Sequence, residues 1–469
     1  LVVGDNNTTV KTRLLDTFGA GDDVVRIGDI VEYELRLGLQ EGTLVDVQAV
    51  DTLPQGLVFE EIVSINGDTT TPYAAAAPFV HPDIPAADIV VAGNAAAGPT
   101  TLTFNLGTIV NQADGNLAND FFVIRYRARV LNLVHPQVNT IGLTNTLAMQ
   151  YTTATVTVTT VAVTESIDVR QPNLAVAKTA VATGGDTVLD ANELVTYTID
   201  ITNGGAAPAY DTVLRDIIPV GMRNGAGTIT VVSVGLLSGG AMPNLAPAYD
   251  AATGVATWDF DSGVADQYAI PAGDTLRLVY QTQTDAGLAP DMTLTNQAQV
   301  QRYYSFDDDA VPTAGVVVGV REIYGPTNTD GVSFTTAGAA GLDKANSAGM
   351  AAIGQPFTYR ITVPAAPQTT ALHDVRILDD LSASAAILEF VKVTKVSGSV
   401  PWTPVNTGTA TNLVIEDTVT GIDIPAGEQI EIDITLRLAD TQPAVSPPPA
   451  PNDTGTLFSN TAAYTLSLI

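Results

Sequence analysis

The chain has 469 residues, with 50 acidic side chains against 20 basic ones, a net charge of −30 and no cysteine. This acidity argues against binding to nucleic acid or to an anionic membrane surface, because both need clustered Lys and Arg. Without cysteine the chain has neither disulfides nor thiolate metal sites, and no apolar run reaches the roughly 18 residues that span a bilayer. It has no initiating Met or signal peptide, as expected of a processed, exported product.

Composition also indicates the fold class. Hydrophobic residues make up 45% of the chain and charged residues 15%, so the chain can bury a substantial core. Thr, Val, Ala, Gly and Asp dominate, which is typical of β-sandwiches with turn-rich loops. The length corresponds to about three domains of ordinary size. We therefore predict an all-β protein of three tandem immunoglobulin-like β-sandwich domains arranged as a rod.

Three of the five lysines recur at one position of a tandem repeat. Lys11, Lys178 and Lys344 lie 167 and 166 residues apart, and the other 15 basic residues are arginines. Self-similarity at a fixed period indicates an array of copies of one structural unit. The predicted domains are 1–168, 169–335 and 336–469. An amine, unlike a guanidinium, can act as a nucleophile, so the retained lysines are candidate reactive groups.

Four blocks follow one another in each repeat, and the first contains the lysine. The second is a strand of alternating polarity with a central tyrosine expected to point inward, as in "DIVEYELRL", "ELVTYTIDI" and "PFTYRITV". The third is a strand that runs into a turn, as in "DVQAVDTLPQGL". The fourth is a late strand that leads to "LTNTLA", "LTNQAQ" or "FSNTAA". The aligned residues are Tyr33, Tyr197 and Tyr359; Asp46, Asp211 and Asp374; Asp51, Asp216 and Asp379; and Asn145, Asn296 and Asn460.

The repeats differ from one another in two places. The first contains an Ala-, Pro- and Thr-rich insertion at about 66–99, which we expect to form a long surface loop. The third ends nine residues after Asn460, so it is expected to lack an edge strand that its predecessors have, unless its own loop caps that edge or the chain continues. The junctions are expected at 166–172 and 305–343, with no flexible Gly/Ser tether in either.

Taken together, the blocks resemble the tandem cell-surface repeat of bacteria and archaea known as a domain of unknown function. That pattern reads KT, GDxVxYTIxVTN, DxLPxGL and LxNxAxV, and the second repeat matches it best, through "VAKTA", "NELVTYTIDITNGG", "RDIIPVGM" and "LTNQAQV". The third repeat departs from it at Ser382 and in "DKAN". The resemblance implies an exported structural or adhesive stalk.

The Lys, Asp and Asn positions are also similar to those of Gram-positive pilin and adhesin domains that form intramolecular Lys-to-Asn isopeptide bonds. In those domains the lysine is on the first strand, the carboxylate on a middle strand and the asparagine on the last strand, held beside the first. The candidate triads are Lys11/Asp51/Asn145, Lys178/Asp216/Asn296 and Lys344/Asp379/Asn460. Burial would favour a neutral amine and a protonated carboxyl, which is the state needed for attack on the amide.

A purely structural interpretation of the same residues is equally open at this point. An Asp before a turn, an Asn at a strand end and a Lys on an edge strand all occur as scaffold residues. His81, His135 and His373 occupy unrelated positions in the repeats, so neither a catalytic triad nor a histidine metal site is expected. The acidic groups Asp22–Asp23 and Asp307–Asp309 are candidates for calcium, although solvated acidic turns are favoured and no cofactor is expected.

These observations favour an extracellular structural protein on the cell surface and argue against an enzyme, beyond self-catalysed bond formation. The expected partner is a second copy of the chain, added head to tail by insertion of the apolar N-terminal "LVV" at the unfilled edge of the third repeat, so as to build a filament, sheath or stalk. The alternative is an adhesin whose long first-repeat loop binds a protein or a glycan. Trp258 and Trp402 are the only tryptophans on which sugars could stack.

Overall fold

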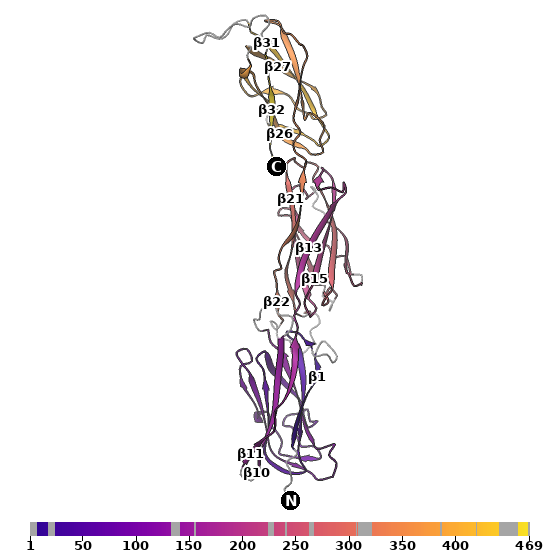
Figure 1. The fold of residues 1–469 in the computed structure, drawn as a ribbon, viewed down its shortest axis with the longest axis vertical. Coiled ribbons are helices and arrows are strands. Elements are labelled where there is room, and N and C mark those ends of the chain that lie inside the picture. The colour runs from indigo at the N-terminus through magenta and orange to yellow at the C-terminus, as the bar shows by residue number, and fades with distance from the viewer. Residues whose placement is uncertain are drawn as a thin grey trace, which may run out of the picture.

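The structure is a computed structural model of the full chain. It describes residues 7–16, 24–132, 141–153, 156–223, 229–239, 242–261, 267–305, 307, 321–384, 387–418, 420–439 and 458–467. These residues form β-strands and two short 3-10 turns, with no α-helix among them. The strands build paired sheets that follow one another along a rod (Figure 1). The fold is therefore all-β, as the composition predicted.

The first sandwich packs a four-stranded sheet against a larger one. The smaller sheet has the order β1 (Thr8–Asp16), β3 (Ile30–Gly38), β9 (Phe121–Val130), β5 (Leu57–Ile65). The larger has β2 (Val24–Val25), β12 (Val163–Val169), β10 (Ile141–Thr153), β4 (Gly42–Leu53), β8 (Thr100–Asn111), β6 (Phe79–Val80), with β11 (Val156–Thr159) on β10 and β7 (Ile89–Gly93) on β8. A 3-10 turn, η1 (Ala86–Asp88), precedes β7.

The second sandwich repeats this plan. Its four-stranded sheet is β13 (Leu174–Ala182), β15 (Leu194–Asn203), β20 (Thr275–Gln283), β17 (Thr230–Leu236). The larger sheet is β14 (Val188–Leu189), β23 (Asp330–Thr336), β21 (Thr293–Tyr304), β16 (Tyr210–Ile217), β19 (Val255–Phe260), β18 (Ala248–Asp250), with β22 (Ile323–Tyr324) on β21.

The third sandwich is the most reduced. Its first sheet is β24 (Asp343–Asn346), β25 (Pro356–Val363), β31 (Ile430–Leu438), β27 (Leu388–Ser397). Its second is β28 (Val405–Asn406), β29 (Asn412–Glu416), β26 (Leu372–Asp380), β30 (Ile422–Ile424), with β32 (Ala462–Ser467) on β26 and a 3-10 turn, η2 (Leu381–Ala383), after β26. Among the described residues β32 pairs with β26 alone, whereas its counterparts β10 and β21 each have a strand on both sides.

The strand order is immunoglobulin-like. The sheet β1-β3-β9-β5 has the A-B-E-D order of that fold, and β12-β10-β4 has the order G-F-C, with β8 added beside β4. The alternating pattern of each strand buries one set of side chains between the sheets. Tyr33, Tyr197 and Tyr359 all point into the cores, at 0%, 0% and 3% exposure. Each sandwich thus encloses its own cluster of buried apolar residues.

Two sequence expectations about connections are corrected. The 66–99 segment is not simply a surface loop, because β6 and β7 pair with β8, and Tyr73, Phe79 and Ile84 are buried. The predicted 305–343 junction is too long, because it contains β22 and β23, which are strands of the second sandwich. In both segments, short apolar stretches between polar and proline residues form strands that extend an existing sheet, β6 and β7 on β8 and β22 and β23 on β21.

Hydrogen bonds link successive sandwiches directly. At the first junction the Arg26 guanidinium donates to the Tyr210 hydroxyl at 2.5 Å, and the Ser305 hydroxyl donates to the Ile27 carbonyl at 3.1 Å. At the second, the Ala371 amide donates to the Leu288 carbonyl at 2.8 Å, and the Ala191 amide donates to the Thr369 carbonyl at 3.0 Å. Such contacts restrict bending of the rod at its junctions.

A β-bulge occurs at one position in every repeat. Asp46, Asp211 and Asp374 have φ angles of 50°, 45° and 53°, in the left-handed region that few residues other than Gly, Asn and Asp adopt. The pairing register shifts at each of these positions. Because every bulge lies five residues before the triad carboxylate, it sets the face of the strand on which that carboxylate is placed.

The bulge predicts that two substitutions at Asp46, whose side chain is exposed, will change the free energy of unfolding by different amounts. Asp46→Val should reduce the free energy of unfolding of the first sandwich by about 1–2 kcal/mol, because a β-branched residue is strained at positive φ. Asp46→Gly should leave it nearly unchanged, since Gly adopts this conformation freely. Chemical denaturation of both variants measures the difference, and equal stabilities would contradict the assignment of strain.

Candidate functional site: a buried lysine, carboxylate and asparagine

The same strand register places the triad lysine in each sandwich. On the first strand, the lysine pairs with the residue two positions after the central tyrosine of the neighbouring strand. These pairs are Lys11 with Leu35, Lys178 with Ile199, and Lys344 with Ile361. Since side chains alternate along a strand, the lysine and the tyrosine project from the same face, toward the core.

The carboxylate and the asparagine lie on adjacent strands of the opposite sheet, except that Asn460 lies two residues before β32 begins. The aspartate pairs with the residue two positions after the asparagine, so the two side chains are diagonal neighbours on one face. The pairs are Asp51 with Leu147, Asp216 with Ala298, and Asp379 with Ala462. The three repeats share this register, so the lysine, carboxylate and asparagine are placed at corresponding positions in each.

The expectation that the lysine and asparagine strands lie side by side is wrong. β1 belongs to the four-stranded sheet and β10 to the larger one, so the two face each other across the core. In the first two sandwiches the asparagine strand is also not the last, because β12 and β23 follow it. Linkage of lysine to asparagine would therefore tie one sheet to the other.

In the first sandwich, the Lys11 ammonium donates to both oxygens of Asp51, at 2.6 and 2.5 Å. The Tyr126 hydroxyl donates to Asp51 at 3.0 Å and accepts from Asn145 Nδ2 at 2.8 Å and from Lys11 Nζ at 3.4 Å. Asp51 and Asn145 are both 0% exposed. The three predicted residues are thus brought together in a closed site.

The second sandwich has the same arrangement. Lys178 Nζ donates to Asp216 at 2.5 Å and to the Tyr280 hydroxyl at 3.0 Å. That hydroxyl donates to Asp216 and accepts from Asn296 Nδ2 at 2.8 Å. Asn145 Oδ1 and Asn296 Oδ1, the carbonyl oxygens of the two amides, are buried without a hydrogen-bond partner.

The third site is less complete. Lys344 Nζ donates to Asp379 at 3.0 Å, and the Tyr359 hydroxyl donates to the same carboxylate. Both polar side-chain atoms of Asn460 are buried without a partner. The lysine side chain is 16% exposed here, against 0% in the other two sites. The lysine and carboxylate meet, but the asparagine makes no hydrogen bond to either.

Sequence reasoning missed Tyr126 and Tyr280. They pair directly with the central tyrosines Tyr33 and Tyr197 across the smaller sheet, whereas Tyr359 pairs with Ile434. The signal was present in the fourth block, where "VIRYRAR" and "RLVYQTQ" align with "EIDITLR". A tyrosine on a half-buried strand is common, so its position beside the triad became apparent only when the sheets were paired.

Burial changes the protonation chemistry of the site. Removal from water lowers the pKa of both Lys11 and Lys178 to about 8, against the opposing attraction of their aspartates. Burial likewise raises the pKa of Asp51. Both changes move the pair toward a neutral amine and a protonated carboxyl, because a low-dielectric core disfavours the charged forms. That is the protonation state in which an amine attacks an amide.

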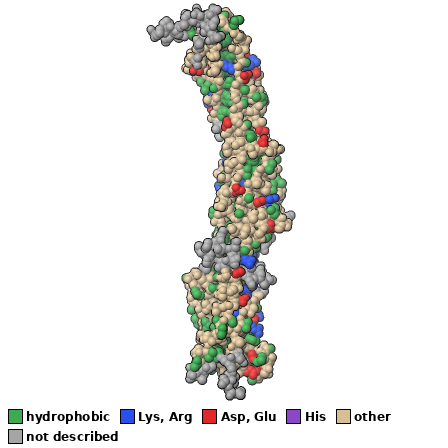
Figure 2. Space-filling model, viewed as in Figure 1, with side chains coloured by type: hydrophobic (Ala, Val, Ile, Leu, Met, Phe, Trp, Pro, Cys, Tyr) green, Lys and Arg blue, Asp and Glu red, His purple; other side chains and the backbone are tan. Residues whose placement is uncertain are grey.

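The other candidate sites are outside the described residues or are unsupported. Asp22, Asp23, Asp308, Asp309 and His135 lie outside those residues, and within them no three His or acidic side chains gather as a metal site. Of the described segments, none forms a helix long and apolar enough to cross a membrane. Lys and Arg side chains are scattered among acidic ones on the visible face of the rod, without a basic stripe (Figure 2).

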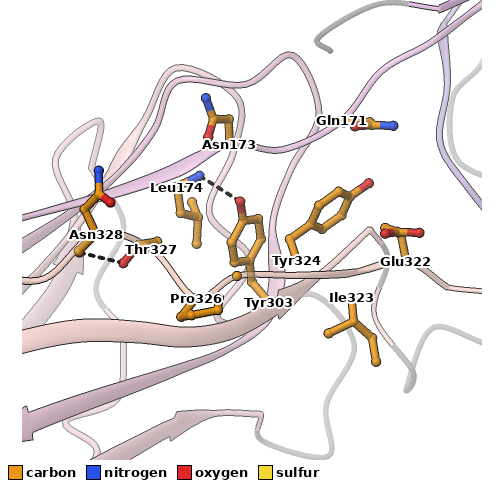
Figure 3. Close-up of a pocket in the computed structure, with 11 residues that line it drawn as sticks. Gln171, Asn173, Leu174, Tyr303, Glu322, Ile323, Tyr324, Pro326, Thr327 and Asn328 are labelled. Carbon is orange, nitrogen blue, oxygen red and sulfur yellow. Dashed lines mark hydrogen bonds between the residues drawn. The ribbon is translucent and has the colours of Figure 1, made fainter. Parts of the chain in front are cut away.

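A polar pocket of about 440 Å³ lies apart from the triads, at the start of β13 and beside β22 (Figure 3). The rings of Tyr303 and Tyr324 stack in it with centroids 5.2 Å apart, and the Tyr303 hydroxyl accepts from the Leu174 amide. Gln171 Oε1, the Tyr324 hydroxyl and Glu322 Oε2 are buried there without hydrogen-bond partners. Nothing in the sequence pattern predicted this pocket.

Comparison with known proteins identifies no family. No family model matches the chain, and no curated protein matches it. Membership of the tandem surface-repeat family therefore stays a prediction.

Among solved structures, the chain is similar to several bacterial proteins. The C-terminal domain of the Streptococcus pyogenes antigen I/II-family protein AspA is 12% identical, over 70% of this chain and 99% of that one, with a TM-score of 0.34. The full-length major pilin SpaD of Corynebacterium diphtheriae is 10% identical, over 68% and 61%, with a TM-score of 0.23. The Enterococcus faecalis MSCRAMM ACE is 11% identical, over 68% and 94%, with a TM-score of 0.21. At these identities and TM-scores, function has to be argued from the chain's own residues.

The protonation of the first site predicts how bond formation depends on pH. The neutral pair (amine and carboxylic acid) and the ion pair (ammonium and carboxylate) each carry one titratable proton, so pH does not change the ratio between them. The rate should therefore fall as pH rises through about 8, where the pair loses that proton and Asp51 can no longer act as an acid. The measurement is the fraction of linked first repeat at timed intervals after refolding of denatured chain at pH 6 to 10. A rate that instead rises to a plateau above pH 8 would mean that only the free amine is limiting.

Proposed function

We propose that the chain is a structural subunit of a bacterial or archaeal surface filament, sheath or stalk whose sandwiches are locked by Lys-to-Asn isopeptide bonds. The observation that carries the proposal is the closed site of the first two sandwiches, where lysine, aspartate and asparagine meet in one register. A buried ion pair is a costly way to stabilise a core, and apolar residues of similar volume are often as good or better. Repetition of the pair at equivalent positions favours a chemical role.

The reaction needs no external reagent. The neutral lysine Nζ attacks the asparagine Cγ, and the carbonyl π electrons move to Oδ1, which takes a proton from the aspartic acid. The C–Nδ2 bond then breaks, Nδ2 leaves as ammonia with a proton that originated on Nζ, and the proton on Oδ1 returns to the carboxylate. The unpartnered Oδ1 atoms of Asn145 and Asn296 are available for this protonation. Folding aligns the groups and so replaces a bimolecular encounter.

The bonds would make a stiff and durable rod. Each would close a loop of 116 to 134 residues, which the chain-entropy model for disulfides values at about 4 to 5 kcal/mol. Each would also join the two sheets of a sandwich, so that pulling on the ends would not peel them apart without breaking a covalent bond. With no cysteine in the chain, this is a route to covalent reinforcement that does not depend on redox conditions.

An intact-mass measurement counts the isopeptide bonds directly. Each bond releases one ammonia, so three bonds predict a mass about 51 Da below that of the sequence and two bonds about 34 Da. In Asp216→Ala the second bond should not form, so the variant's mass deficit against its own sequence should be about 17 Da smaller than the wild-type deficit. The melting temperature of its second sandwich should also fall. Asp200→Ala, at a partly exposed ion pair with Arg277 on the same sandwich, is the matched control and should keep the full deficit. A wild-type chain with no mass deficit would contradict the cross-linking proposal.

Head-to-tail assembly would use the free edge of β32. This strand pairs only with β26 among the described residues, and its alternating pattern leaves Ala463 and Thr465 exposed. An unpaired edge is a template for a strand from another chain, and a contact of this kind does not close on itself. The N-terminal "LVV" predicted to supply that strand lies outside the described residues.

Negative-stain microscopy tests assembly. Wild-type chain should form filaments without added ligand, whereas the double substitution Ala463→Lys and Thr465→Lys should leave single rods, because lysines on an edge strand oppose further pairing. Ala463→Ser with Thr465→Ser is the control and should still assemble.

Single rods of wild-type chain at all concentrations would instead favour the alternative, an adhesin that binds a protein or glycan. The pocket with stacked Tyr303 and Tyr324 is the observation that favours this second function, since it offers an aromatic surface and unpartnered polar atoms for a ligand.

A further inference from the structure

We propose that the hydroxyl of Tyr126, and that of Tyr280 in the second sandwich, is the proton relay of the bond-forming reaction, and that Ile434 leaves the third site without one. This inference rests on the proposed isopeptide chemistry and adds a catalytic residue to it. In the second sandwich a single hydroxyl contacts the attacking nitrogen at 3.0 Å, the leaving nitrogen at 2.8 Å and the carboxylate. Tyr126 makes the same three contacts in the first sandwich.

The aspartate by itself does not reach both nitrogens. Asp216 accepts from Lys178 and from Tyr280, while the hydrogen bond donated by Asn296 Nδ2 goes to the tyrosine. The reaction must nevertheless remove a proton from Nζ and deliver one to Nδ2 before ammonia can leave. The tyrosine oxygen is the atom that connects the carboxyl group to the leaving nitrogen.

The relay transfers protons in balance. After attack, the carboxylate accepts the proton from Nζ. The tyrosine then gives its own hydroxyl proton to Nδ2 and takes from the carboxyl group the proton that came from Nζ, so the hydroxyl is regenerated. Burial and the nearby aspartate raise the pKa of Tyr126 and Tyr280 well above the usual range. A free phenolate is therefore unfavourable, and the hydroxyl passes one proton only as it receives another.

The third repeat is a natural variant of the relay. Ile434 occupies the position of Tyr126 and Tyr280 opposite the central tyrosine. The Tyr359 hydroxyl donates to Asp379, and Asn460 lies near enough to oppose the rise that burial causes in the pKa of that hydroxyl but makes no hydrogen bond of normal geometry to it. The third site therefore lacks the continuous hydrogen-bonded connection between carboxyl group and leaving nitrogen that the other two have. We expect the third bond to form more slowly than the other two in the same molecule.

The test follows each bond separately in the full chain. Denatured, unlinked chain is refolded, quenched at intervals and digested, and the linked peptide of each repeat is quantified by mass spectrometry. In wild type the first and second repeats should link faster than the third. Tyr280→Phe should slow the second repeat on the order of 10²-fold, the usual size of a general acid–base contribution. The first repeat, which retains Tyr126, is the internal control and should keep its rate.

Phenylalanine preserves the ring that stacks on Tyr197 at 5.1 Å and contacts Trp258 at 5.3 Å, so it removes the hydroxyl with little change in packing. Ile434→Tyr supplies the opposite change and should accelerate the third bond in a chain whose other two rates are unchanged. Equal rates for the second repeat in wild type and Tyr280→Phe would overturn the relay while leaving the cross-link intact. Absence of every bond from wild type would instead overturn the proposed function itself.

Discussion

The ion pair between a buried lysine and a buried aspartate is the interaction on which each sandwich is centred. Lys178 and Asp216 have side chains with no exposure to solvent, and they come from opposite sheets. Transfer of two charges out of water costs several kcal/mol per ion, and their attraction repays this only with good geometry and further hydrogen bonds. The tyrosine hydroxyl supplies one such bond in both complete sites. Linkage of the lysine to the asparagine would leave a neutral amide beside a protonated carboxyl group, and so would remove both buried charges.

The rest of the repeat serves to hold that pair in position. The bulge at Asp46, Asp211 and Asp374 fixes which face of the middle strand carries the carboxylate, and the shared register fixes the lysine opposite it. Hydrogen bonds at the junctions then join one sandwich to the next. A rod of this kind has its strength in the connection between sheets, because neighbouring strands within a sheet are already joined by ladders of backbone hydrogen bonds.

Differences between the repeats are as informative as their similarities. The third has Ile434 in place of a tyrosine, a more exposed lysine and an asparagine without partners. It also has a strand whose outer edge is unpaired among the described residues. Its site and its edge are thus both less complete than those of the repeats before it.

The sequence by itself determined the all-β class, the period near 166 residues, the inward tyrosines and the recurrence of Lys, Asp and Asn at fixed positions of the repeat. These follow from side-chain alternation and from residues that recur at a fixed period, which are local properties of the chain. Tertiary structure alone decided that the lysine and asparagine strands lie in opposite sheets, that Tyr126 and Tyr280 join the triad, and that the 66–99 insertion adds strands to a sheet. Each of these depends on which strands pair and which faces meet across the core, and such contacts between residues distant in sequence leave no periodic signal along the chain.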